Sequence, residues 1–161
     1  MKKQKIITEF EVYEELSDLP EYVQHLMLQA KEARIKAYAP YSNFLVGAAI
    51  LLANGEVVTG SNQENSSYPS GLCAERTAIY AAGANYPNIA IKTVVITAGP
   101  RNSINTIPVP PCGACRQAMA EYEQKQSEPI EVYFMAQEGK ICKVNSLLEL
   151  LPLAFDKDFL K

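Results

Sequence analysis

The sequence predicts an α/β fold, a three-layer α-β-α sandwich in which helices cover both faces of a mixed five-stranded sheet. A hairpin pattern followed by alternating strand and helix patterns favours a mixed sheet with helices on its two faces. The run Ile91 to Ala98 (IKTVVITA) is apolar enough for a strand buried on both faces. At 161 residues, with 48% hydrophobic and 20% charged residues, the chain has the size and composition of one globular domain.

The first element expected is a helix that follows a polar arm. Residues 1–16 are mixed and polar, and we predict an amino-terminal extension, residues 1–17, before a single domain, residues 18–161. Asp18-Leu19-Pro20-Glu21 is typical of a helix start with an aspartate cap, and Ala39-Pro40 is expected to end the helix. One apolar stripe at three- and four-residue steps is formed by Leu19, Val23, Leu26, Ala30, Ala33 and Ala37.

The remaining elements follow from apolar runs and turn residues. Asn54-Gly55 is a strong hairpin signal, and Ser146-x-x-Glu149 has the spacing of a capping box. The predicted elements are strands 44–52 and 56–59, loop 61–72, helix 73–84, strand 91–98, loop 99–111, helix 112–125, strands 129–136 and 141–144, and a short helix that ends at Pro152.

Composition and charge disfavour several classes of protein. A net charge of −3 and a sequence pI near 5.3 argue against nucleic-acid binding, which depends on clustered Lys and Arg. No apolar run approaches the roughly 20 residues that span a bilayer, so we expect no membrane association. The basic start Met1 to Lys5 is followed by Ile6-Ile7 and then Thr8-Glu9, without a signal-peptide core. We therefore expect a cytoplasmic protein.

Three cysteines at two places predict a metal site. Cys112 and Cys115 have the C-x-x-C spacing at which two thiolates can bind one metal ion, and Cys73 can supply a third ligand. Three protein ligands leave the fourth position for water, as in catalytic zinc sites. Glu75 lies two residues after Cys73 and can reach that water without binding the metal.

The charge of such a site needs compensation. Three thiolates around Zn²⁺ leave a local charge of −1, which weakens the pull of the metal on a bound water. Both cysteine groups fall at predicted helix starts, where the helix dipole favours negative charge. Arg76 and Arg116 are the other positive groups available for charge balance.

Other assignments of these residues are weaker. The structural alternative is a closed four-cysteine site with Cys142 as fourth ligand, but Cys142 stands alone in a strand-like run and is better explained as a small core residue. A thioredoxin-like pair at Cys112 and Cys115 is a further alternative. His25, the single histidine, falls off the apolar stripe of its helix and is predicted on an exposed face.

The two motifs, C-x-E-R and P-C-x-x-C-R-Q, carry the signature of zinc deaminases, in which the Glu is general acid and base. Over about residues 30–155 the sequence resembles cytidine deaminase, of the small homotetrameric type that uses three cysteines on zinc. The resemblance extends to Tyr41-Ser42-x-Phe44-x-Val46-Gly47-Ala48-Ala49, Gly60-x-Asn62-x-Glu64-Asn65 and Leu150-Leu151-Pro152-x-Ala154-Phe155.

The resemblance implies an activity, a cofactor and a role for several residues. It implies hydrolytic deamination of cytidine and 2′-deoxycytidine in pyrimidine salvage by a homotetramer with one Zn²⁺ per chain. The metal ligands implied are Cys73, Cys112 and Cys115, and the proton shuttle is Glu75. Asn62 and Glu64 would bind the sugar hydroxyls, Phe44 would stack on the pyrimidine, the backbone at Ala74 would read the base, and Phe155 would enter a neighbouring subunit's pocket.

Two other functions compete with this one. An enzyme of the same chemistry could act on a nucleoside-like antibiotic or on cytosines within a polynucleotide, although Asn62 and Glu64 favour a free sugar and the acidic pI disfavours a long nucleic acid. A non-enzymatic, zinc-stabilised binding protein would have no need of Glu75. The amino-terminal extension and the loop Tyr68 to Leu72 depart from the common family pattern.

Overall fold

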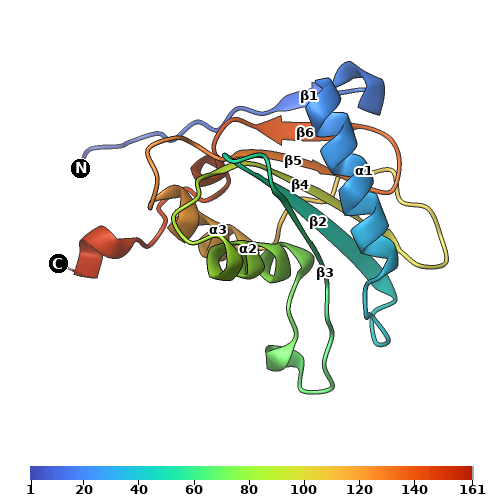
Figure 1. The fold of residues 1–161 in the computed structure, drawn as a ribbon. Helices are drawn as coiled ribbons and strands as arrows, with labels where there is room; N and C mark the ends of the chain where they lie inside the picture. The colour runs from blue at the N-terminus through green and yellow to red at the C-terminus, as the bar shows by residue number, and fades with distance from the viewer. Residues whose placement is uncertain (161) are drawn as a thin grey trace.

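The computed structural model describes residues 1–160 and contains a six-stranded mixed sheet with helices on both faces (Figure 1). The strands are β1 (Glu11–Tyr13), β2 (Phe44–Leu52), β3 (Val57–Ser61), β4 (Ile91–Pro100), β5 (Glu131–Met135) and β6 (Ile141–Val144). The α-helices are α1 (Glu21–Ile35), α2 (Ala74–Asn85) and α3 (Gly113–Glu123). The short 3-10 helices are η1 (Leu16–Asp18), η2 (Tyr68–Ser70), η3 (Leu147–Leu150) and η4 (Lys157–Leu160). The predicted α/β sandwich is confirmed.

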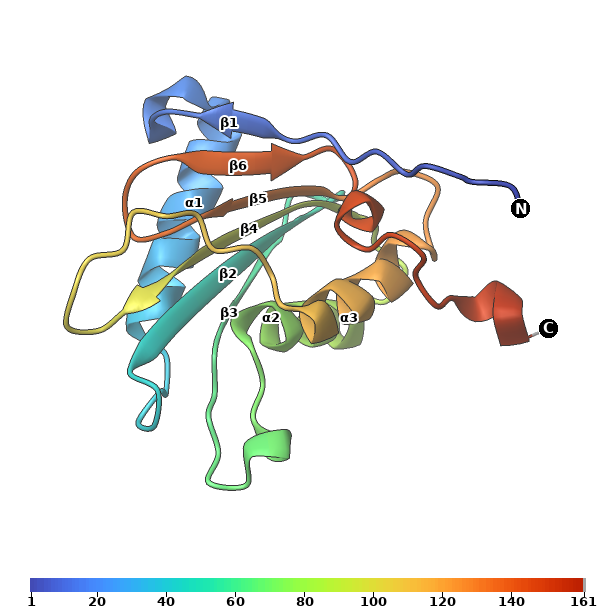
Figure 2. The ribbon, with the colours of Figure 1, turned by 180° about the vertical axis from the view of Figure 1, so that it is seen from behind.

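The sheet has the order β1-β6-β5-β4-β2-β3, in which β4 and β5 are parallel and all other neighbours are antiparallel (Figure 2). The prediction of five strands is wrong by one. Val12 of β1 pairs with Cys142, so part of the predicted polar arm forms an edge strand beside β6. Lys143 Nζ lies 3.3 Å from a carboxylate oxygen of Glu11 and 3.3 Å from one of Glu131. This lysine of β6 therefore forms ion pairs with both neighbouring strands, β1 and β5. Three residues are too few for an alternating pattern to be visible in the sequence.

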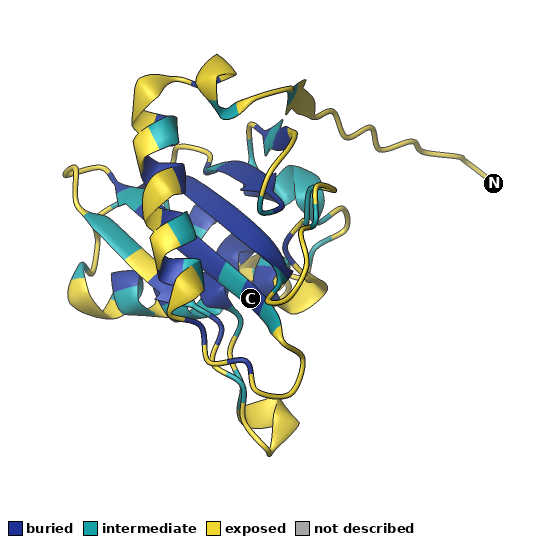
Figure 3. Ribbon diagram, turned by 90° about the vertical axis from the view of Figure 1, so that its right-hand side faces the viewer, coloured by how far each residue is buried: buried dark blue, intermediate teal, exposed yellow. Residues whose placement is uncertain are grey.

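The two faces of the sheet carry separate apolar layers. Val95 of β4 packs toward α1, whereas Val94 and Ile96 pack toward α2 and α3. The central strands are therefore buried on both faces, as predicted for residues 91–98, and the outer faces of the helices are exposed (Figure 3). The side chains of α1 that join the first layer are Val23, Leu26, Met27 and Ala30. Those of α2 and α3 that join the second are Ala74, Ala78, Ile79, Ala82, Cys115, Met119 and Ala120.

The start of α1 differs from the prediction. Pro20 has an extended backbone (φ −53°, ψ 143°) and is the residue before the helix, which has no side-chain cap. Asp18 lies too early to cap α1. It closes η1 instead, where its carboxylate accepts a hydrogen bond of 3.0 Å from the backbone N–H of Glu15. The helix ends at Ile35, before the predicted stop, and His25 is exposed as expected.

The buried carboxylate of Glu123 connects α3 to two later segments of the chain by hydrogen bonds. Glu123, at the end of α3, accepts hydrogen bonds from the backbone N–H groups of Ile130 (2.8 Å) and Leu147 (2.9 Å) and from the Ser146 hydroxyl. Ser146 in turn caps η3 by accepting from the N–H of Leu148 at 3.2 Å. Glu123 therefore ties α3 to the start of β5 and to the turn after β6. Among residues 1–160, no helix combines the length and apolarity needed to cross a membrane.

Candidate metal centre and adjoining cavity

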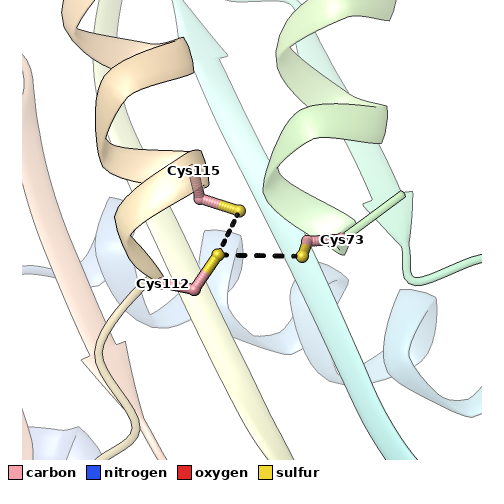
Figure 4. Close-up of side chains that lie close together, drawn as sticks. All are labelled: Cys73, Cys112 and Cys115. Carbon is pink, nitrogen blue, oxygen red and sulfur yellow. Dashed lines mark hydrogen bonds between the residues drawn. The ribbon is translucent and has the colours of Figure 1, made fainter. Parts of the chain in front are cut away.

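Three cysteine thiols meet where the amino termini of α2 and α3 lie side by side (Figure 4). Cys73 is the residue immediately before α2, Cys112 has the same position before α3, and Cys115 lies in the first turn of α3. The Sγ atoms of Cys73 and Cys112 are 3.9 Å apart, and those of Cys112 and Cys115 are 3.5 Å apart. All three lie within 4.8 Å of one another, so one metal ion could contact them together.

Cys142 does not belong to this group. It is buried in β6 among core residues that include Phe134 and Val144. Burial raises the pKa of its thiol, which disfavours the metal-binding thiolate. The described residues therefore contain a three-thiol site and give no support to a closed four-cysteine site.

Positive charge lies close to the thiols. Arg76 Nη2 is 3.7 Å from Cys73 Sγ. A hydrogen bond from the Cys115 thiol, together with this guanidinium, lowers the pKa of Cys73 to about 5. The pKa of Cys115 is raised because it donates that bond and is buried. Arg116, the other candidate for charge balance, donates instead to the carbonyl oxygens of Pro111 (2.8 Å) and Leu150 (3.0 Å).

Glu75 lies in the first turn of α2 and is only 4% exposed. Burial raises the pKa of its carboxyl, and the nearby Cys73 thiolate raises it further. A carboxyl group whose pKa is moved toward neutrality can both accept and release a proton during a reaction. Its side chain lines the same cavity as Cys73 and Cys112.

The cavity beside the thiols has a volume of about 620 Å³. Its walls come from the turn before β2 and the start of that strand, the loop between β3 and α2, the first turn of α2, part of β4 and the segment that ends at Cys112. Phe44, Asn62 and Glu64 all line it, so the structure brings these three predicted residues to the same cavity as Cys73, Cys112 and Glu75. A cavity of this size can hold a nucleoside-sized ligand.

Two other predicted site residues do not line the cavity. Ala74 is fully buried and is not part of the cavity wall. Phe155 is 58% exposed in the carboxyl-terminal segment, where its ring stacks on Phe159 with centroids 5.7 Å apart. Gln117 Nε2 donates to the carbonyl oxygen of Phe155 at 2.9 Å, which fixes the backbone of this segment against α3.

Asn62 and Glu64 are held by the polypeptide itself. The Asn62 amide accepts from the N–H of Val46 (2.8 Å) and donates to the carbonyl of Phe44 (2.9 Å), so it continues the β2–β3 pairing with side-chain atoms. The Glu64 carboxylate accepts from the N–H groups of Tyr41 (2.9 Å) and Ser42 (3.2 Å) and from the Ser42 hydroxyl.

Several cavity residues had no role in the sequence-based prediction. Tyr41, Ser42 and Tyr68 line the cavity, and the rings of Tyr41 and Tyr68 lie 5.8 Å apart at a tilt of 57°. Tyr41 and Ser42 belong to the recognised motif before Phe44, which is the signal that could have drawn attention to them. Tyr68 is part of the loop that departs from the common pattern.

Comparison with known families agrees with this geometry. Residues 20–128, more than half of the chain, match the family described as "Cytidine and deoxycytidylate deaminase zinc-binding region". The chain belongs to the cytidine deaminase family. This is a family of hydrolytic enzymes, as the two cysteine motifs predicted. The matched span begins at residue 20 and includes all three cysteines of the cluster.

Individual cytidine deaminases are similar over most of their length. The cytidine deaminase of Halalkalibacterium halodurans is 42% identical over 132 residues, covering 82% of this chain and 92% of the relative. That of Sporosarcina psychrophila is 39% identical over 136 residues, covering 84% and 93%. The crystal structure of cytidine deaminase from Burkholderia pseudomallei has a TM-score of 0.70 at 39% identity, covering 85% of this chain and all of that one.

Proposed function

We propose that this chain catalyses the hydrolytic deamination of cytidine and 2′-deoxycytidine to uridine and 2′-deoxyuridine, with release of ammonia, in pyrimidine salvage. The observation that carries the proposal is the buried Glu75 carboxyl, which shares one cavity with the cysteine cluster and with Phe44 and Glu64. A site that only stabilised the fold would need the thiols and not this carboxyl. The similarity to named cytidine deaminases supports the same substrate class.

The proposed cofactor is one Zn²⁺ per chain, held by Cys73, Cys112 and Cys115. Tetrahedral zinc with Zn–S bonds of about 2.3 Å separates two thiolates by about 3.8 Å. The observed Sγ separations of 3.9 and 3.5 Å lie on either side of that value, so the donor set and its spacing both suit zinc. Arg76 and the two helix amino termini are proposed to offset the negative charge of the thiolates.

The proposed mechanism assigns the proton movements to Glu75. When bound, zinc supplies the Lewis acidity that makes a water molecule a competent nucleophile near neutral pH. Glu75 accepts a proton from the attacking water and delivers it to the pyrimidine ring nitrogen. It then carries a second proton from the newly added hydroxyl group to the exocyclic amine, which leaves as ammonia. Water adds to the carbon that bears the amine, so the reaction consumes one water and yields the ring carbonyl.

The remaining residues are proposed to bind the nucleoside. Phe44 stacks on the pyrimidine, Asn62 and Glu64 face the sugar hydroxyls, and the backbone at Ala74 reads the base. Phe155, which is exposed and outside the cavity wall of its own chain, is proposed to reach the pocket of a neighbouring subunit in a homotetramer. Cytoplasmic residence and the boundary between extension 1–17 and domain 18–161 remain predictions.

The test combines turnover with metal analysis. We expect the purified protein to contain one zinc per chain and to lower the absorbance of cytidine as uridine forms. Glu75→Ala should keep its zinc and lose at least about 10²-fold in kcat, the usual scale for general acid–base catalysis. Full activity in that variant would contradict the mechanism. Zinc-loaded wild-type protein inactive on every aminopyrimidine nucleoside would favour the non-enzymatic alternative, and an active monomer in sedimentation would contradict the tetramer.

A further inference from the structure

The short turn before β2 is held in one conformation by its own hydrogen bonds. Asn43 has a positive φ of 54°, a left-handed conformation that asparagine tolerates better than most residues. Its N–H donates to the carbonyl of Ala39 at 3.2 Å, and its carbonyl accepts from the N–H of Arg101 at 2.7 Å. Asn43 is therefore anchored through both its N–H and its carbonyl, directly after Ser42, which lines the cavity.

The hydroxyl of Ser42 joins two residues of the proposed substrate site. Its Oγ donates to the Glu64 carboxylate and accepts a hydrogen bond of 3.0 Å from the backbone N–H of Phe44. A serine hydroxyl has a single donor, and here it is directed at Glu64. The proposed base-stacking residue and the proposed sugar-binding residue are thus connected through one oxygen atom.

The bonds to Glu64 leave a limited capacity for a ligand. An ionised carboxylate offers about four lone-pair sites, and the bonds from Tyr41 N–H, Ser42 N–H and the Ser42 hydroxyl occupy three of them. The hydrogen bond from Ser42 also lowers the pKa of Glu64, which keeps the carboxylate ionised. The one lone-pair site that remains on the Glu64 carboxylate could accept a hydrogen bond from one sugar hydroxyl. The three bonds already made fix the orientation of the carboxylate, and so fix the direction from which that hydroxyl must approach.

We propose that Ser42 is a positioning residue, whose hydroxyl holds the Glu64 carboxylate and the Phe44 peptide in one geometry for binding the nucleoside. This inference depends on the proposed function, because it assigns Glu64 to the sugar. It differs from a role in folding alone, since Ser42 is exposed and its hydroxyl bonds run toward cavity residues rather than into either apolar layer.

The experiment measures kcat and KM for cytidine in zinc-loaded variants. Ser42→Ala is expected to lower kcat/KM by about tenfold, as for loss of a hydrogen bond to a charged group, mainly through a higher KM. Ser42→Thr keeps the hydroxyl and should recover most of the loss. Ser17→Ala is the matched control, because Ser17 is an exposed serine in η1 whose hydroxyl donates a hydrogen bond to Glu15 and which does not line the cavity.

A double-mutant cycle separates positioning from simple structural support. In a Glu64→Ala background, Ser42→Ala should lower kcat/KM for cytidine by less than about threefold, because the carboxylate that Ser42 orients is gone. A parallel measurement uses 2′,3′-dideoxycytidine, which lacks the 2′- and 3′-hydroxyls of the sugar. Ser42→Ala should lower kcat/KM less with this substrate than with cytidine. Thermal unfolding of Ser42→Ala should match that of the wild type.

Any of four results would overturn the inference: the same loss of kcat/KM with and without Glu64, the same loss with the dideoxy substrate, a Ser42→Thr variant as poor as Ser42→Ala, or wild-type kcat/KM in Ser42→Ala. Wild-type protein that fails to deaminate cytidine at all overturns the proposed function, and this inference with it. The two failures are distinguished by the wild-type assay.

Discussion

Replacing Gly60 by alanine would test how closely α2 must approach the sheet for the site to form. A Cβ atom on Gly60 would lie 2.6 Å from the carbonyl oxygen of Ala74, 2.6 Å from the backbone nitrogen of Ala78 and 3.0 Å from its Cβ. Ordinary contact begins at 3.4 Å, so α2 would have to withdraw by about 0.8 Å (3.4 − 2.6). The nearest atoms are backbone, and no change of rotamer relieves the overlap.

This displacement should affect both stability and catalysis. Overpacking costs about 1–3 kcal/mol, and we expect Gly60→Ala to lower the free energy of unfolding by about 3 kcal/mol, since the obstructing atoms are rigid. The first turn of α2 carries Glu75 and follows Cys73, so the same shift should lower kcat/KM by about 10- to 100-fold. Urea denaturation followed by circular dichroism measures the first effect, because the chain has no tryptophan for fluorescence.

Gly113→Ala provides the matched control. No heavy atom lies within 4 Å of the Cβ position at Gly113, so the free energy of unfolding should change by no more than about 0.5 kcal/mol. If the Gly60 and Gly113 variants unfold at the same urea concentration, the contact between α2 and β3 is not the rigid one described, and the argument fails.

Other parts of the molecule give further expectations. Deletion of residues 1–13 removes β1 and its hydrogen bonds to β6, and it should lower the free energy of unfolding by about 1–3 kcal/mol; unchanged urea denaturation would show that β1 contributes little. Cys142→Ala should keep one zinc per chain by metal analysis, whereas Cys112→Ala should lose it, and zinc loss in the former would restore Cys142 as a ligand. Glu123→Ala leaves three hydrogen-bond donors without their acceptor and should lower the free energy of unfolding by about 3 kcal/mol or more. A melting temperature equal to that of the wild type would contradict this expectation.

The main elements of the fold were predictable because their signals are local. The apolar stripe of α1, the Asn54-Gly55 turn and the continuous apolar run of β4 each express one element's periodicity or turn chemistry. β1 was not predictable, since Val12 becomes strand only through pairing with a segment near the other end of the chain. The aspartate cap failed because the extended backbone of Pro20 delays the helix beyond the reach of Asp18.

The cysteine cluster could be predicted for a different reason, which is that metal chemistry demands three ligands and only a few residues qualify. The contacts of Ser42 and Asn62 could not be predicted in this way. Serine and asparagine are common in loops, and nothing in the sequence distinguishes a hydroxyl bonded to Glu64 from one that faces water. Only the folded turn before Phe44 brings these atoms together.

The placement of the three thiols also has a consequence for the chain as a polymer. Cys73 and Cys112 are 39 residues apart in sequence, and α2 and β4 lie between them. An ion that bridges them closes this loop as a covalent cross-link would, and a loop of that length corresponds to on the order of 4 kcal/mol of chain entropy in the unfolded state. The affinity of the site for zinc and the resistance of the protein to unfolding would then be thermodynamically linked, so that tighter zinc binding would raise the free energy of unfolding.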